Sequence, residues 1–213
     1  VASPVADLPL AVVMARQVVT GPLADTFVVL LTGDGGWAGL DQDVAGALTQ
    51  RGVPVVALST LRYFWRERSP GEAAQDLTRI IQHYAVAWRR HQVLLVGYSF
   101  GANVLPFMVG QLPRATRHMI RSISLLAPAT HTGFEVHVAD WIPGSVPEGR
   151  PVQPAVESLA GTPILCLYGE GQADNLCAEL PKDLARSLEL PGGHHFDGDS
   201  ATLAREILGF TGL

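Results

Sequence analysis

Residues 97–101 (GYSFG) contain the side chain best suited to chemistry, a serine between two glycines in the pattern G-x-S-x-G. The apolar residues 93–97 indicate a buried strand, and the residues from there to 111 indicate a helix. A sharp strand-to-helix turn projects a serine hydroxyl above the sheet edge, where it can attack a carbonyl carbon. The pattern therefore predicts Ser99 as a nucleophile.

A serine nucleophile needs a base and an acid that orients the base. On this kind of turn the partners follow in the order serine, acid, histidine, each after a late strand. His194 follows a glycine pair and is the predicted base, with His195 as its competitor or as a substrate contact. Asp174 is the predicted acid, with Glu170 as the alternative nearer the end of the preceding strand.

Acyl transfer also needs preorganised donors for the oxyanion. One is predicted to be the backbone N–H of Phe100, the residue after the nucleophile. The others are expected from Asp34 and Gly35, in the glycine-rich turn 33–37 (GDGGW) after a strand at 27–32. The glycines of this turn are not spaced as in the phosphate-binding loops of nucleotide sites, which disfavours a nucleotide site here.

Aromatic residues follow the next strand, residues 53–58, at the edge of the sheet where open α/β folds bind ligands. Tyr63, Phe64 and Trp65 could form a pocket wall for an acyl or lipid group, or could pack on the core. Both interpretations stay open from the sequence. Trp37 is a further candidate substrate contact.

The whole chain alternates apolar β-branched runs with helical periodicity, which is typical of a mostly parallel sheet covered by helices. Expected strands occupy 10–19 (a strand or hairpin), 27–32, 53–58, 93–97, 120–126, 163–168 and 187–190, and expected helices occupy 41–51, 72–88, the stretch to 111 and 201–210. Pro106 could kink its helix. Residues 128–162 lack periodicity and form a candidate minimal cap or a connection. These features predict one α/β-hydrolase domain over 1–213.

Composition excludes several classes of function. The 213 residues carry a net charge of −5, which disfavours nucleic-acid binding, and the basic stretch 114–121 is expected to face water. No apolar run is long enough to span a bilayer. The histidines lack metal-ligand spacing, so neither a metal nor a cofactor is expected. The chain starts at Val1, which fits a processed product that has lost a signal peptide.

With these segments identified, the sequence resembles the VirJ/AcvB family of bacterial virulence-associated hydrolases. The resemblance rests on five segments in the expected order: 33–37 (GDGGW), 61–65 (LRYFW), 97–101 (GYSFG), 166–169 (CLYG) and 190–199 (LPGGHHFDGD). It implies a periplasmic enzyme that removes lysyl or alanyl groups from aminoacyl-phosphatidylglycerol at the membrane surface. Ser99, Asp174 and His194 would be its triad, and type IV secretion components would be partners in some bacteria.

Two positions depart from the family pattern, Asn103 in place of an aspartate and Asn175 in place of a serine after the acid. An oxidising periplasm would favour a disulfide between Cys166 and Cys177, although Cys166 could equally be a buried free thiol.

The ammonium of an aminoacyl ester could be bound by Asp34, Asp140 or Glu170. Two rival interpretations remain. One is an esterase or thioesterase for another acyl substrate, and the other is a secretion adaptor whose catalysis is dispensable.

Overall fold

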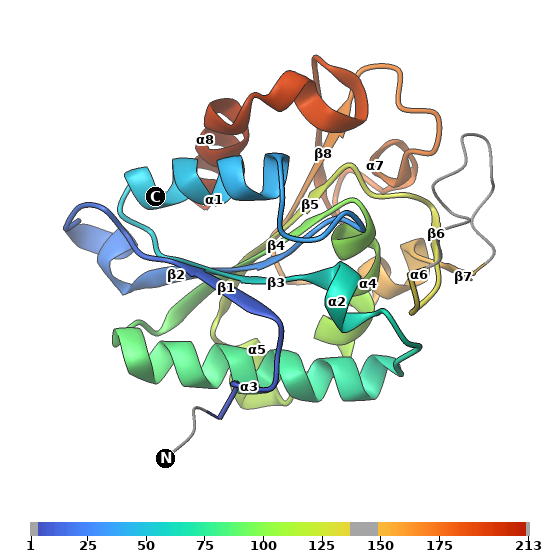
Figure 1. Cartoon of the computed structure of the whole chain (residues 1–213). Helices are drawn as coiled ribbons and strands as arrows, with labels where there is room; N and C mark the ends of the chain where they lie inside the picture. The colour runs from blue at the N-terminus through green and yellow to red at the C-terminus, as the bar shows by residue number, and fades with distance from the viewer. Residues whose placement is uncertain (1–3, 137–148, 212–213) are drawn as a thin grey trace.

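The computed structural model describes residues 4–136 and 149–211 and shows a twisted central sheet between two layers of helices (Figure 1). Within these residues the main sheet has seven strands in the order β1-β3-β2-β4-β5-β8-β9. The strands are β1 Leu10–Val13, β2 Thr26–Leu31, β3 Val55–Leu58, β4 Gln92–Tyr98, β5 Ile120–Leu126, β8 Ile164–Gly169 and β9 Arg186–Leu190. β1 is antiparallel to β3, and the other neighbours are parallel. The prediction of an α/β-hydrolase fold is confirmed.

The continuous apolar runs of the central strands are explained by burial on both faces of the sheet. One core cluster lies between the sheet and helices α3 (Pro70–Trp88) and α4 (Phe100–Gly110). The other lies between the sheet and helices α1 (Leu40–Gln50) and α8 (Ser200–Phe210). Figure 1 shows α1 and α8 together on one face and α3 on the other.

The strand order reverses between β2 and β4, because β3 lies on one side of β2 and β4 lies on the other. Ligands in open α/β sheets bind at such a switch point, outside the carboxyl ends of the strands. The turn after β2 and the turn after β4 border this crevice. The topology therefore brings the glycine turn at 33–37 next to Ser99.

The short helices lie mostly in the connections. They are α2 Thr60–Tyr63, α5 Arg114–Arg117, α6 Gln153–Glu157 and α7 Leu176–Glu179, with 3-10 turns η1 Gly21–Asp25 and η3 Gly193–Gly198. The predicted cap at 128–162 contains α6 and a two-stranded ribbon of β6 (His131–Thr132) and β7 (Arg150–Pro151), while its residues 137–148 lie outside the described structure.

One expectation needs correction, and the structure adds to two others. The strand expected at 10–19 is only Leu10–Val13, because the sheet edge it pairs with, β3, is itself only four residues long. Pro106, which could kink its helix, lies inside α4, and this helix is a single element from Phe100 to Gly110. The open choice for the cysteines is decided by a disulfide between Cys166 on β8 and Cys177 on α7.

Candidate active site

Ser99 forms the junction between β4 and α4 with backbone angles φ 50° and ψ −118°. A positive φ in a residue with a side chain costs on the order of 1–3 kcal/mol and needs support from its surroundings. The flanking glycines provide this support by close packing. A Cβ on Gly97 would lie 2.6 Å from the Gly101 carbonyl oxygen, and a Cβ on Gly101 would lie in the backbone at the end of β2. The two glycines of the G-x-S-x-G pattern are therefore required because the neighbouring backbone leaves no room for a side chain at either position.

His194 is the histidine that faces the serine. Its Nε2 lies 2.9 Å from the Ser99 Oγ, which is hydrogen-bond distance. The ring reaches this position from the turn η3, which begins at Gly193. Gly192 and Gly193 both have left-handed backbone conformations, with φ of 91° and 59°. Partial burial, and then the neighbouring His195, lower the pKa of His194. The ring is therefore neutral near pH 7 and can accept a proton.

His195 is held elsewhere. Its Nδ1 lies 2.7 Å from the Tyr98 hydroxyl, which also lies 3.3 Å from the His194 carbonyl oxygen. Tyr98, the last residue of β4, is buried, and its ring packs against Gly33 of the glycine turn. The structure therefore brings His194, and not His195, to the nucleophile.

Asp174 lies across a hollow from His194. Its Oδ1 accepts the Thr130 N–H at 2.8 Å, and its carbonyl oxygen accepts the side chain of Gln172 at 2.7 Å. Within the described residues Asp174 makes no hydrogen bond to His194. The alternative acid, Glu170, has an exposed side chain, and its backbone N–H donates to the Leu190 carbonyl oxygen.

The loops that carry Asp174 and His194 touch through glycines. A Cβ on Gly169, at the end of β8, would overlap the Gly193 carbonyl group. This contact is possible only because Gly169 has no side chain. The acid loop and the base loop are therefore packed backbone against backbone.

The glycine turn after β2 lies directly against the nucleophile. A Cβ on Gly33 would lie 3.7 Å from the Ser99 Cβ. Among the described residues, the N–H groups of Asp34, Gly35 and Phe100 have no hydrogen-bond acceptor, so they remain available to a ligand. The Asp34 carboxylate is also near enough to His194 to favour its protonated form, although burial outweighs this effect.

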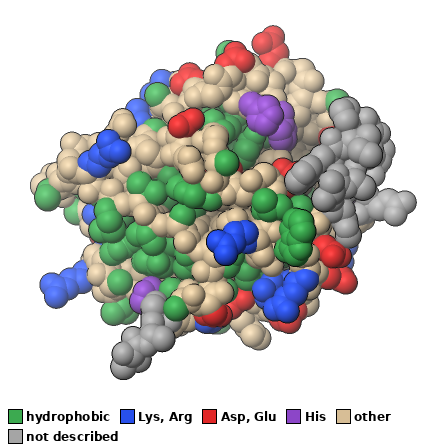
Figure 2. Space-filling view, in the orientation of Figure 1, with side chains coloured by type: hydrophobic (Ala, Val, Ile, Leu, Met, Phe, Trp, Pro, Cys, Tyr) green, Lys and Arg blue, Asp and Glu red, His purple; other side chains and the backbone are tan. Residues whose placement is uncertain are grey.

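A hollow of about 530 Å³ opens at Ser99. It is lined by Ser99, Ala127, Ala129, Gly171, Gln172, Ala173, Asp174, Gly193 and His194. Figure 2 shows histidine side chains exposed on a face that also carries hydrophobic and basic side chains. Ser99 and Asp174 both line the hollow, so it lies between the candidate nucleophile and the candidate acid.

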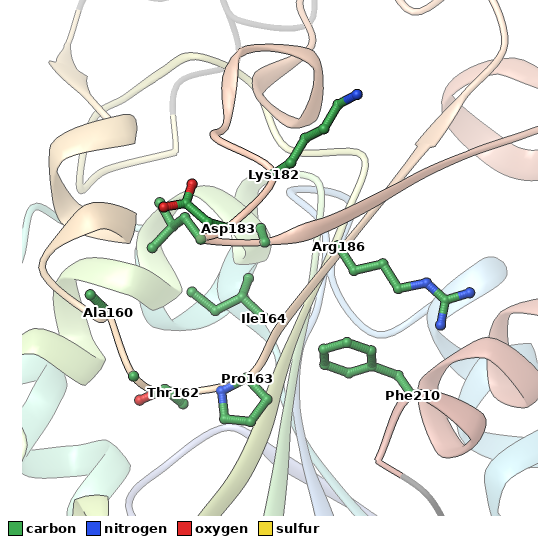
Figure 3. Close-up of a pocket in the computed structure, with 11 residues that line it drawn as sticks. Ala160, Thr162, Pro163, Ile164, Lys182, Asp183, Arg186 and Phe210 are labelled. Atoms are coloured by element: carbon green, nitrogen blue, oxygen red, sulfur yellow. The ribbon is translucent and has the colours of Figure 1, made fainter.

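A second hollow, of about 410 Å³, lies at the starts of β8 and β9, at the opposite edge of the sheet (Figure 3). Lys182, Asp183 and Arg186 are its charged residues, and the Lys182 side chain extends away from it. It contains neither a nucleophile nor a paired base. We therefore place the candidate chemistry at Ser99.

The aromatic residues after β3 differ in their exposure to solvent. Tyr63 and Phe64 are 1% and 0% exposed, and Phe64 packs edge-on against Phe100. Of the two interpretations that the sequence left open, packing on the core therefore describes these two side chains. Trp65 is 64% exposed, while Trp37 packs partly on the α1 and α8 core, and neither lines the hollow at Ser99.

Two residues that support the site had no predicted role. Asn103, one turn beyond Ser99 on α4, accepts the N–H of Ala129, a residue that lines the hollow, at 2.8 Å. Tyr98 holds His195. Tyr98 directly precedes the nucleophile and Asn103 follows it by four residues, and these positions are the sequence signal that could have identified them. Asp140, proposed for ammonium binding, lies outside the described residues.

Across residues 4–136 and 149–211, His, Cys, Asp and Glu do not gather in threes in a way that could hold a metal ion. In the same residues, no helix has both the length and the apolar character needed to cross a membrane.

The sheet, its switch point and the strained serine turn define the α/β-hydrolase fold. Residues 25–211 match the family described as Bacterial virulence protein (VirJ), so the chain belongs to the VirJ family. No curated relative matches.

Solved structures with this fold include Est1E from Butyrivibrio proteoclasticus, with 14% identity, a TM-score of 0.65 and coverage of 96% of this chain and 94% of that chain. MenH from S. aureus has 14% identity, a TM-score of 0.64 and coverage of 94% and 97%. LpqC, a poly(3-hydroxybutyrate) depolymerase from Bordetella parapertussis, has 17% identity, a TM-score of 0.60 and coverage of 94% and 86%. At these identities the likeness concerns the fold.

Proposed function

We propose that this protein is a serine hydrolase that cleaves carboxylic esters at Ser99. The observation that carries the proposal is the 2.9 Å separation between Ser99 Oγ and His194 Nε2 at the strained turn. Neutral His194 takes the hydroxyl proton as Oγ attacks the ester carbonyl. The free N–H groups of Asp34, Gly35 and Phe100 stabilise the oxyanion.

His194 then gives its proton to the leaving alcohol oxygen, and an acyl-serine remains. A water molecule, deprotonated by His194, attacks this acyl group and releases the carboxylic acid, and the proton returns to Ser99. Asp174 is the proposed orienting acid. Because Asp174 has no hydrogen bond to His194 among the described residues, this role requires a rotation of its carboxylate, which Thr130 holds through Oδ1, or a movement of its loop.

The proposed substrate is the aminoacyl ester of lysyl- or alanyl-phosphatidylglycerol. Membership of the VirJ family and the family resemblance support this choice. The Asp34 carboxylate, close to His194, suits a substrate that brings an ammonium group to the reacting ester. Trp65 is exposed between the exposed side chains of Arg62 and Arg66, a composition that suits an anionic lipid surface.

The proposed location is the periplasm, which the buried Cys166–Cys177 disulfide supports, because disulfides persist in oxidising compartments. Type IV secretion components are the proposed partners in an adaptor role that could accompany catalysis. A Ser99→Ala variant separates the two roles, because only the catalytic role needs the hydroxyl.

The decisive experiment is labelling by a fluorophosphonate probe, followed by mapping of the modified residue. We expect labelling of Ser99, which is lost in Ser99→Ala and His194→Ala but kept in Ser158→Ala, an exposed serine on another element. Turnover of lysyl-phosphatidylglycerol vesicles, a p-nitrophenyl ester and an acyl thioester then identifies the substrate class. Labelling that survives Ser99→Ala would refute the proposed nucleophile.

A further inference from the structure

The carbonyl oxygen of Gly33 is held by an unusual number of donors. The Gly36 N–H lies 3.0 Å from it, the Thr60 Oγ1 lies 2.6 Å from it, and the Thr32 Oγ1 lies 3.0 Å from it. A carbonyl oxygen has two lone pairs, so donors at three positions around it oppose a rotation of this carbonyl group. The peptide group that follows Gly33 is therefore fixed in orientation.

The two threonines form a buried pair that connects two strand ends. Thr32 follows β2 and Thr60 begins α2 after β3, and neither has exposed surface. The Thr32 Oγ1 accepts the Thr60 N–H at 3.0 Å, and the Oγ1 atoms lie 3.2 Å apart. Because the Thr32 hydroxyl accepts this bond, its own proton stays available for the Gly33 carbonyl.

The peptide after Gly33 consists of the Gly33 carbonyl and the Asp34 N–H. In a planar trans peptide these two groups point in opposite directions, so an anchor on the oxygen also aims the N–H. The remaining freedom of Gly33 is limited by two neighbours. Its N–H donates to the Asp41 Oδ2 at 3.3 Å, and its Cα faces the Tyr98 ring.

We infer that Thr60, together with Thr32, is a positioning residue that aims the Asp34 N–H at the oxyanion formed on Ser99. The inference rests on the proposed function, because it assigns a supporting group to that same reaction. The Thr60 hydroxyl has no hydrogen bond to Ser99. It lies 2.6 Å from the Gly33 carbonyl oxygen and 3.0 Å from the Thr32 carbonyl oxygen, and so acts through the backbone that precedes Asp34.

This role predicts a specific kinetic effect. Loss of an oxyanion donor typically lowers kcat by about 10²–10³, so a misaimed donor in Thr60→Val should lower kcat by roughly tenfold to a hundredfold. KM should change little, because the oxyanion forms only in the transition state. Affinity for a boronic acid, which forms a tetrahedral adduct on the serine, should fall with kcat.

The experiment compares Thr60→Val, Thr60→Ser and Thr49→Val with a soluble p-nitrophenyl ester. Serine keeps the hydroxyl and should restore kcat to within about threefold of wild type. Thr49 is the matched control, because it is equally buried and its hydroxyl also binds a carbonyl oxygen, that of Gly46, within α1. Thr32→Val tests the pair if Thr60→Val fails to fold.

The outcomes distinguish a failure of the proposed hydrolase function from a failure of the positioning role of Thr60. A valine variant that folds and keeps wild-type kcat overturns the inference, and so does an equal loss in Thr60→Ser and Thr60→Val. If wild type fails to turn over any ester, thioester or aminoacyl lipid, the proposed function fails first and the inference fails with it. A loss confined to kcat in Thr60→Val, absent in Thr49→Val, supports the inference.

Discussion

The Tyr98 hydroxyl and the His195 Nδ1 lie 2.7 Å apart, and this bond separates the roles of two adjacent histidines. It fixes His195 beside β4 while His194 turns to Ser99. The two imidazole rings remain only 5.4 Å apart, centre to centre. A positive charge on His195 therefore opposes a positive charge on His194.

Replacing His195 with glutamine should shift the pH dependence of catalysis. Burial is the main cause of the lowered pKa of His194, and the His195 charge adds to it. Removing that charge raises the pKa of His194 toward its ordinary value, so the acid limb of kcat/KM should move to higher pH. A pH–rate profile measures this, with His118→Gln as a control at an exposed, distant position. An unmoved limb would contradict the proposed electrostatic coupling between His195 and His194.

Asp174→Asn tests the proposed acid. If Asp174 orients His194, kcat should fall by up to roughly 10⁴ for all esters, because asparagine cannot stabilise the imidazolium. The measurement compares a lysyl ester with an uncharged acyl ester, and Glu170→Gln is the control. A loss restricted to the lysyl ester would show that Asp174 binds the ammonium across the hollow instead.

Asp41→Asn should alter how stability depends on pH. Asp41 is 4% exposed, its Oδ1 has no partner among the described residues, and burial raises its pKa to about 7. The folded protein therefore keeps the proton that the unfolded chain loses near pH 4, and the free energy of unfolding falls as pH rises from there to about 7.

The asparagine of this variant would retain an acceptor for the Gly33 N–H and remove this fall. Urea unfolding should show a variant close to wild type at pH 4 and more stable by roughly 4 kcal/mol at pH 8. Asp43→Asn, exposed in the same helix turn, is the control. Parallel stability curves for wild type and Asp41→Asn would refute the buried proton.

Removing the disulfide should cost both stability and activity. Cys166 and Cys177 are 11 positions apart, and closing a loop of this size stabilises a protein by about 3 kcal/mol. The loop contains Asp174, so kcat should fall as well. Urea unfolding and ester turnover of Cys166→Ser/Cys177→Ser measure the two effects. Dithiothreitol should lower the stability of wild type and leave the double variant unchanged; equal responses would contradict this account.

Trp65→Ala should separate lipid access from chemistry. The exposed indole is expected to insert at a membrane surface, so its loss should lower turnover of aminoacyl-lipid vesicles by about tenfold. Turnover of a soluble ester should stay unchanged, because Trp65 does not line the hollow at Ser99. Val86→Ala, an exposed apolar position on α3, is the control. Equal losses on vesicles and on soluble ester would argue against a lipid-contact role.

Much of the fold could be predicted because its central strands are buried on both faces and so appear as continuous apolar runs. The strand expected at 120–126 matches β5, and the run at 27–32 differs from β2 by one residue. The predicted length of edge strand β1 was too great. The length of a half-exposed strand depends on the strand it pairs with, and sequence periodicity does not reveal that partner.

The site could be predicted only in part. The strand–turn–helix context located Ser99, and the glycine pair located the loop of His194. Burial of Tyr63 and Phe64 depends on how α2 packs on α4, a contact between distant segments that local sequence does not encode. The bond between Asp174 and Thr130 is equally non-local.

The overlap that any side chain on Gly169 would have with Gly193 makes the two loops at the ends of β8 and β9 a single mechanical unit. A residue inserted into either loop shifts its neighbour, so the spacing between carboxylate and imidazole cannot be tuned from one side alone. A bulkier ester is therefore expected to require matched changes in both loops, because neither can move away from the hollow at Ser99 without its neighbour.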